Sequence, residues 1–347
     1  MKKKVFPRRI LRIPLLCLCT WLLVSCPLAS GQTVDTVHSQ SNPKYVPAVK
    51  SDRLTSAPTV PVADNKPLRV SVDVVLVPVT VSDRHNRPVT SLNRKDFSVF
   101  EDDKRQEIRY FSAEQSPLSI AILFDVSKSM TDKIDSERDA LIEFFNNANP
   151  ADEYFAITFS DRPRVLASST QSIDELQNKL LAIEPGGPTA MLDAVYLAES
   201  KLRSAHYERK AIVIFSDGGD NASRYKLREI KSLVQESDVE VYAIGLFDKF
   251  LIGAVEEKLG KEWLSEITDA SGGRTVTVDN RAKLPDAAAL ISREIRTQYV
   301  LGYHPLIRNA GAWRKIKVAV TDPVTQQHLY AHYRKGYLGS GKATTQN

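Results

Sequence analysis

Residues 120–129 of the chain read Ile-Ala-Ile-Leu-Phe-Asp-Val-Ser-Lys-Ser, an apolar run followed by a carboxylate and two hydroxyls. A short apolar run bounded by polar residues is typical of a strand that is buried on both faces of a parallel sheet. Asp125, Ser127 and Ser129 would then leave the carboxyl end of a central strand, where open α/β sheets bind ligands. Their hard oxygen donors favour Mg²⁺ or Mn²⁺ over zinc.

Two later segments supply further oxygen ligands for the same edge. Residues 211–215 form a second apolar run, and Asp217 follows it closely. A Gly-Gly-Pro-Thr segment that ends at Thr189 precedes an amphipathic pattern typical of a helix. The carboxyl ends of parallel strands meet at one edge of a sheet. We therefore expect Asp217 beside Asp125, and Thr189 at a helix start on the same rim.

Together, these three segments resemble the von Willebrand factor A family over roughly residues 116–297. The resemblance implies an α/β fold with a doubly wound, mostly parallel Rossmann-like sheet. It also implies a metal-ion-dependent adhesion site that holds Mg²⁺ or Mn²⁺, and a protein partner that offers a carboxylate to the bound cation. The residues that match the family's site are Asp125, Ser127, Ser129, Thr189 and Asp217.

Each segment taken alone has a simpler interpretation. Asp-x-Ser-x-Ser is a common turn composition, a threonine before a helix can cap it, and Asp-Gly is an ordinary turn signal. The order of the three segments, each at the end of its expected element, favours a metal site over three unrelated turns. Three neighbours are not assigned to the metal: Asp193 is interpreted as a first-turn helix charge, Asp220 as a loop residue and Lys128 as an exposed loop lysine.

Residues 116–297 alternate apolar runs with helical spacings, a pattern that predicts an α/β domain with a parallel sheet. Strands are expected at 118–124, 153–159, 163–168, 211–215, 239–245 and 274–278. β patterns also occupy residues 67–115 and 298–338. Each of these flanking parts is too small to stand alone. We therefore expect them to pair as one β-sandwich-like module that the α/β domain interrupts.

Within the N-terminal β module, residues 97–100 and 108–111 flank a charged turn and predict a hairpin. After the α/β domain, strands are expected at 298–304, 313–320 and 327–333. This order of modules resembles a bacterial exported subgroup of the family, the acidobacterial-type A-domain proteins. The resemblance to that subgroup adds no specific function.

Residues 1–31 are predicted to be a signal peptide, because six basic residues precede a short apolar stretch at 15–24. Two patterns fit the sequence. One is ordinary cleavage at Ala29-Ser30-Gly31, and the other is a lipoprotein pattern in which an acylated Cys26 attaches the protein to a membrane. The expected location is periplasmic, in the cell envelope or secreted. Residues 32–66 and 339–347 are expected to be a disordered linker and a disordered tail.

The net charge of +5 comes from the predicted signal peptide. Without residues 1–31, the chain has 41 basic and 42 acidic residues, so its composition gives no support for nucleic-acid binding. The three cysteines, Cys17, Cys19 and Cys26, lie in or beside the same segment. No disulfide is therefore expected in the rest of the chain.

The sequence favours an exported, non-enzymatic adhesion module that binds an acidic residue of a protein partner through its cation. Two other functions stay open. One is a structural envelope scaffold that keeps a metal for stability, and the other is a metal-dependent hydrolase. The hydrolase is the weaker alternative, because Ser127 stands where aspartyl-phosphate phosphatases place a second carboxylate, and neither Gly-x-Ser-x-Gly nor His-Glu-x-x-His occurs. No catalytic residue is assigned.

Overall fold

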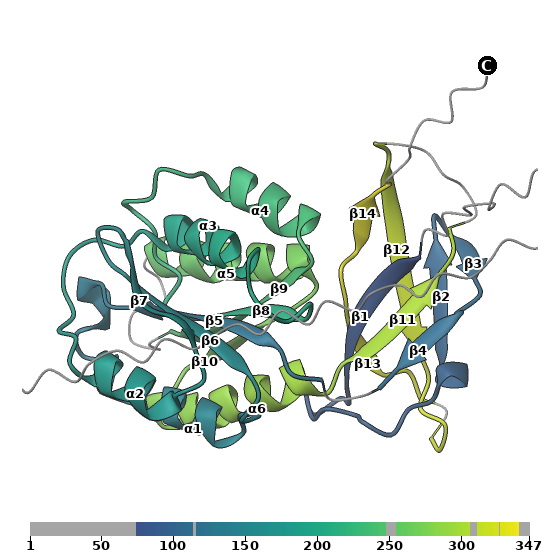
Figure 1. Cartoon of the computed structure of the whole chain (residues 1–347), viewed down its shortest axis with the longest axis horizontal. Helices are drawn as coiled ribbons and strands as arrows, with labels where there is room; N and C mark the ends of the chain where they lie inside the picture. The colour runs from purple at the N-terminus through teal and green to yellow at the C-terminus, as the bar shows by residue number, and fades with distance from the viewer. Residues whose placement is uncertain (1–73, 114–115, 248–254, 306–310, 326, 340–347) are drawn as a thin grey trace, which may run out of the picture. The chain divides into compact units, whose positions relative to one another are not determined.

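The computed structural model describes residues 74–113, 116–247, 255–305, 311–325 and 327–339 (Figure 1). The predicted signal peptide and linker lie outside these residues, as does the predicted tail beyond residue 339. None of the described helices combines the length and apolarity that a membrane crossing needs.

A six-stranded sheet forms the centre of the α/β domain, with the strand order β10-β9-β8-β5-β6-β7. Every neighbouring pair is parallel except β6 and β7, which are antiparallel. The strands are β5 (Ser119–Asp125), β6 (Glu153–Phe159), β7 (Pro163–Thr170), β8 (Lys210–Ser216), β9 (Val239–Leu246) and β10 (Thr275–Val278). All the strands expected from sequence in this domain are therefore present, with bounds shifted by a residue or two.

Two hydrophobic cores explain why the run that forms β5 is apolar throughout. Ile120, Ile122 and Phe124 pack into one core, and Ala121 and Leu123 pack into the other. Successive side chains of a strand point to opposite faces, so a strand covered on both faces needs apolar residues at every position. Figure 1 shows the two covering layers. One face carries α1 (Ile134–Asn146), α2 (Ile173–Leu181) and α6 (Leu284–Arg296), and the other carries α3 (Met191–Leu202), α4 (Leu227–Glu236) and α5 (Val255–Ser271).

Two further sheets contain strands from both sides of the α/β domain. One has the order β13-β1-β11-β4, and the other has the order β14-β12-β2-β3. A single hydrophobic core joins them, with Val77 and Val79 from one sheet packed against Val99 and Val318 from the other. The strands are β1 (Val75–Ser82), β2 (Phe97–Glu101), β3 (Lys104–Gln106), β4 (Tyr110–Ser112), β11 (Tyr299–Tyr303), β12 (Trp313–Val320), β13 (Tyr330–His332) and β14 (Gly336–Leu338). The expected fold class is confirmed: a Rossmann-like α/β domain with additional antiparallel sheets.

The expected hairpin between residues 97–100 and 108–111 is wrong. β2 pairs instead with β3, which starts directly after Asp103, and β4 pairs with β11 in the other sheet. The reason is the turn: Asp102 and Asp103 both have positive φ, 45° and 63°. Two such residues make the tight connection whose twist matches an antiparallel strand pair, so the chain folds back at once. β14 is a strand that the sequence analysis did not predict.

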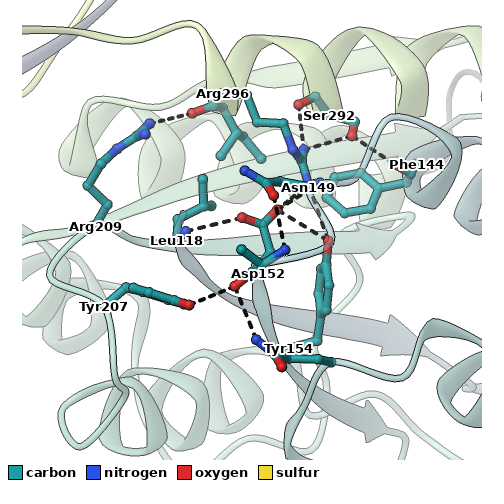
Figure 2. A network of polar contacts seen from close by, with 12 residues as sticks. Leu118, Phe144, Asn149, Asp152, Tyr154, Tyr207, Arg209, Ser292 and Arg296 are labelled. Atoms are coloured by element: carbon teal, nitrogen blue, oxygen red, sulfur yellow. Dashed lines mark hydrogen bonds and ion pairs between the residues drawn. The ribbon is translucent and has the colours of Figure 1, made fainter. Parts of the chain in front are cut away.

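A buried polar network lies at the amino ends of β5 and β6 (Figure 2). Asp152 accepts hydrogen bonds from the Leu118 amide at 3.1 Å and from Arg296 Nη2 at 2.7 Å. Arg296 also donates to the Ser292 hydroxyl and carbonyl. Neither charged side chain of this pair is more than 10% exposed. The network thus joins β5 and β6 to the last turn of α6 at the edge opposite Asp125.

Arg209 holds the two segments that connect the α/β domain to the other sheets. Its guanidinium donates to the Ser116 carbonyl at 2.9 Å, just before β5, and to Gln298 Oε1 at 3.0 Å, just before β11. It also donates to the Ile295 carbonyl at 2.8 Å. The chain therefore enters and leaves the α/β domain at neighbouring points, tied by one side chain.

The Asp152→Ala variant should lose about 3–5 kcal/mol of stability, because it leaves the buried Arg296 guanidinium without its counter-ion. Urea unfolding followed by circular dichroism measures this loss. Glu175→Ala is the control, since the Glu175 pair with Lys179 is about half exposed and such pairs contribute little. Equal losses in the two variants would contradict the role given to the network.

Candidate metal centre

Asp125 ends β5 with its carboxylate completely buried and held by two donors. Oδ1 accepts a hydrogen bond from the Ser127 amide at 2.9 Å, and Oδ2 accepts one from the Ser216 hydroxyl at 2.5 Å. Ser216 is the last residue of β8, the neighbouring strand, and its hydroxyl also accepts from the Gly218 amide at 2.9 Å. The two strand ends are thus joined through side chains, and Asp125 has a fixed orientation.

The two serines of the Asp-x-Ser-x-Ser segment lie together. A short 3₁₀ turn at Lys128–Met130 brings the Ser127 and Ser129 hydroxyl oxygens to 3.0 Å from each other. The intervening Lys128 is exposed, as expected, while its backbone amide donates to the Gly187 carbonyl at 2.9 Å. The Gly186 amide donates back to the Val126 carbonyl at 2.8 Å. The serine segment and the loop that leads to Thr189 are therefore linked by two backbone hydrogen bonds.

Thr189 lies two residues before α3 and is held by its backbone. Its amide donates to Asn221 Oδ1 at 2.9 Å, and its carbonyl accepts from the amides of Asn221 and Ala222, both at 2.9 Å. Thr189 is only 5% exposed, and its hydroxyl makes no hydrogen bond within the described residues. Asn221 therefore positions Thr189 while leaving the hydroxyl available to a ligand.

The start of α3 is capped by other residues, so the interpretation of Thr189 as a capping hydroxyl is wrong. The Leu192 amide donates to Asp220 Oδ2 at 2.8 Å, and the Asp193 amide donates to the Ser223 hydroxyl at 3.1 Å. The Asp193 carboxylate accepts from the backbone amide and Nε of Arg224 and from the Tyr225 amide. The carboxylates of Asp193 and Asp220 thus accept hydrogen bonds that join the start of α3 to the loop at residues 220–225, in line with their expected structural roles.

Asp217 forms a buried ion pair that the sequence analysis did not predict. Its Oδ2 accepts from Lys133 Nζ at 2.9 Å, and the two side chains are 10% and 7% exposed. Its Oδ1 accepts from the Gly219 amide at 3.3 Å. Lys133 immediately precedes α1, and it places an ammonium against one of the two expected carboxylate ligands.

A third carboxyl group, that of Glu137, is buried in the same region. Glu137 is 1% exposed, and its Oε2 has no hydrogen-bond partner among the described residues. Burial raises its pKa well above the usual range, and the charges of Asp125 and Asp217 raise it further. The spacing Glu137, Ala140, Leu141, Phe144 runs along the buried face of α1. A charged residue at that position was the signal that could have identified it from sequence.

The buried carboxylates influence one another. Burial, followed by the charge of Asp217, raises the pKa of Asp125 from 3.8 to about 7. In the described part of the chain, no three Asp, Glu, His or Cys side chains are grouped so that they alone could hold a metal ion. A cation at this edge would therefore depend on hydroxyl and water oxygens as well as on the two aspartates.

Residues 120–219 match the family model of the von Willebrand factor type A domain. The chain contains a von Willebrand factor type A domain. The matched residues begin in β5 and end just after Asp217, so the match covers all five candidate ligands.

Curated relatives of the domain include inter-alpha-trypsin inhibitor heavy chain H4 from Homo sapiens, 26% identical over 146 residues. The match covers 38% of this chain and 16% of that relative. The Bos taurus protein of the same name is 27% identical over 127 residues, covering 32% and 14% of the two chains. Among solved structures, a von Willebrand factor type A protein from Catenulispora acidiphila matches with a TM-score of 0.47 and 11% identity. That match covers 78% of this chain and 74% of the other.

The Asn221→Ala variant should loosen the von Willebrand factor A domain at Thr189. Removing the side-chain acceptor deprives the Thr189 amide of its hydrogen bond, which is worth about 1–2 kcal/mol, or a factor of roughly 5–30 in local opening. Hydrogen exchange followed by NMR should show the Thr189 amide exchanging faster by that factor. Asn147→Ala, which removes a bond to the Glu143 carbonyl, should leave Thr189 unchanged. Unaltered exchange in Asn221→Ala would contradict the positioning role.

Stability without metal should depend on pH through Asp125. Its folded pKa is about 7 and its unfolded value is near 3.8, so folding takes up a proton between these values. The stabilisation of the folded state by protonated Asp125 is complete below pH 4 and is lost as the pH rises to 7. Between pH 5 and pH 8, the free energy of unfolding of the metal-free wild type should fall by about 2–3 kcal/mol more than that of Asp125→Asn. Urea unfolding in EDTA measures this difference. The exposed control Asp135→Asn should follow the wild type, and parallel pH profiles for wild type and Asp125→Asn would contradict the assignment.

Proposed function

We propose that this domain binds an acidic side chain of a protein partner through a divalent cation held at Asp125, Ser127, Ser129, Thr189 and Asp217. Von Willebrand factor A domains generally mediate protein–protein interaction or adhesion. The proposal is supported by the pair of buried carboxylates, Asp125 and Asp217, at the ends of adjoining strands, and by the Ser127 and Ser129 hydroxyls that follow Asp125 and lie 3.0 Å from each other.

The charges in this region fit a dication. This region buries three carboxyl groups, those of Asp125, Asp217 and Glu137, and one ammonium, that of Lys133, which contacts Asp217. When all four groups are ionised, the sum of their charges is minus two, which one Mg²⁺ or Mn²⁺ would neutralise. Buried charges that lack compensation are costly, so the protein gains stability from a ligand of that charge.

The chemistry of the donors also fits Mg²⁺ or Mn²⁺. Both ions prefer oxygen ligands, and Mg²⁺ usually keeps several water molecules in an octahedral shell. Five side-chain donors leave one position of an octahedral shell to water, and an anion can take that position. A carboxylate from a partner supplies such an anion. Lys128 lies exposed between the two serines and adds positive charge to the rim that such a partner would meet.

A location outside the cytoplasm is part of the proposal. It is supported by the basic and apolar pattern of residues 1–31. Cys26 offers a second route to the envelope, by acylation, and mass spectrometry of the native N-terminus distinguishes the two outcomes.

A structural scaffold is the second candidate, and the repulsion between Asp125 and Asp217 favours it. A cation that relieves this repulsion stabilises the folded state by mass action whether or not a partner binds. The two functions differ in one respect: adhesion needs a partner that leaves when the cation is removed.

Isothermal titration with Mg²⁺ should give binding heat with the wild type and none with Asp125→Ala or Thr189→Ala. The matched control is Thr131→Ala, because Thr131 lies in the adjoining turn and its hydroxyl bonds the Lys128 carbonyl. Equal heats from wild type and Asp125→Ala would end the proposal.

A pull-down from envelope extract, with and without EDTA, then separates the two candidates. A partner that elutes with EDTA from the wild type and is not retained by Thr189→Ala indicates adhesion. Thermal stabilisation by Mg²⁺ without such a partner indicates the scaffold.

A further inference from the structure

Lys133 is positioned to interact with two buried carboxyl groups. Its Nζ donates to Asp217 Oδ2 at 2.9 Å. Glu137 follows four residues later, and its amide donates to the Lys133 carbonyl at 3.1 Å. This first-turn hydrogen bond places the two residues on the same side of α1, and the charge of Lys133 acts on the Glu137 carboxyl, so the two groups lie near each other.

One carboxyl oxygen of Glu137 is buried without a hydrogen-bond donor. Buried polar atoms are nearly always hydrogen-bonded, because an unsatisfied group has lost its water without replacement. Glu137 Oε2 is buried and has no partner in the described part of the chain. The lysine that could supply a donor is bonded to Asp217 instead. An acceptor is therefore present for a second position of the Lys133 ammonium.

We infer that Lys133 is an internal counter-ion that pairs with Asp217 when the site lacks a dication and pairs with Glu137 when a dication is bound. This inference rests on the proposed function. An ammonium and a dication repel each other when they share one carboxylate, and the lysine side chain is long and flexible enough to change partners without moving its backbone. Glu137 then gains the donor that it lacks.

Two properties follow from this exchange. The metal-free domain stays folded, because Asp217 is not left as an unpaired buried charge. The site also discriminates by charge, because a monovalent ion offers Asp217 no more charge than the tethered ammonium already supplies. A dication offers twice that charge, so Lys133 and Glu137 act as positioning residues that select for it.

A double-mutant cycle tests the exchange, with Mg²⁺ affinity measured by calorimetry in wild type, Lys133→Met, Glu137→Gln and the double variant. Lys133→Met removes the competitor and should bind Mg²⁺ at least about tenfold more tightly. Glu137→Gln removes the negative charge of the second acceptor and should bind Mg²⁺ about tenfold more weakly, because a neutral amide oxygen is a poorer partner for the displaced ammonium. In the Lys133→Met background the Glu137→Gln substitution should change affinity by less than about threefold, since Glu137 acts through Lys133.

The alternative is a simple field effect of each charge on the cation, and it predicts a different result. Glu137→Gln would then weaken binding equally with and without Lys133, and that additivity would overturn the exchange. A weaker affinity in Lys133→Met would also overturn it. Absence of Mg²⁺ heat in the wild type would instead remove the proposed function itself. The matched controls are Lys179→Met and Glu175→Gln, a glutamate–lysine pair of the same spacing and opposite order on the surface of α2, which should not alter affinity.

A second measurement covers the case in which Lys133→Met does not fold. NMR of the lysine ammonium groups in the wild type should show the Lys133 signal shifting when Mg²⁺ is added, with the Lys179 signal unchanged. In Glu137→Gln with Mg²⁺ the Lys133 signal should move to a different position, because a neutral amide replaces the charged second acceptor. A Lys133 signal that Mg²⁺ leaves unmoved, in a protein that gives binding heat, would overturn the exchange.

Discussion

Repulsion between Asp125 and Asp217, two carboxylates buried at the ends of adjoining parallel strands, is the constraint on which the candidate site depends. Each is supported by donors: Asp125 by the Ser127 amide and the Ser216 hydroxyl, and Asp217 by the Lys133 ammonium. Even so, burial and mutual repulsion leave the pKa of Asp125 near 7. Stability alone would be served better by neutral side chains, and this cost is the physical basis for the cation that we propose at this site.

The central sheet was predictable because its strands are buried on both faces. A strand such as β5 contributes to two cores at once and must be apolar at every position, which makes it visible in the sequence. β3 and β14 are three residues long and have no such pattern. The pairing of β3 with β2 depends on the left-handed conformations of Asp102 and Asp103, which composition alone did not specify.

The candidate ligands could be proposed from the sequence because each lies beside a recognisable element in a fixed order. The residues that position them were not, because their roles arise from contacts between distant parts of the chain. Ser216 lies 91 residues from Asp125, Lys133 lies 84 residues from Asp217, and Asn221 lies 32 residues from Thr189. No local spacing encodes such contacts. Glu137 is the exception, because a charge on the apolar face of α1 is a local irregularity.

The order in which the protein can fold follows from the position of the α/β domain between the strands of the other two sheets. β1 finds its partner β11 only after the whole α/β domain has been synthesised, and Arg209 ties the two ends of that domain together. Closing so long a loop is slow unless the intervening chain is already compact. An α/β domain that is already folded brings β1 and β11 close together, so the outer sheets can close quickly around it. Before β11 pairs with it, the valine-rich β1 is an unpaired strand, a kind of segment that is prone to aggregate.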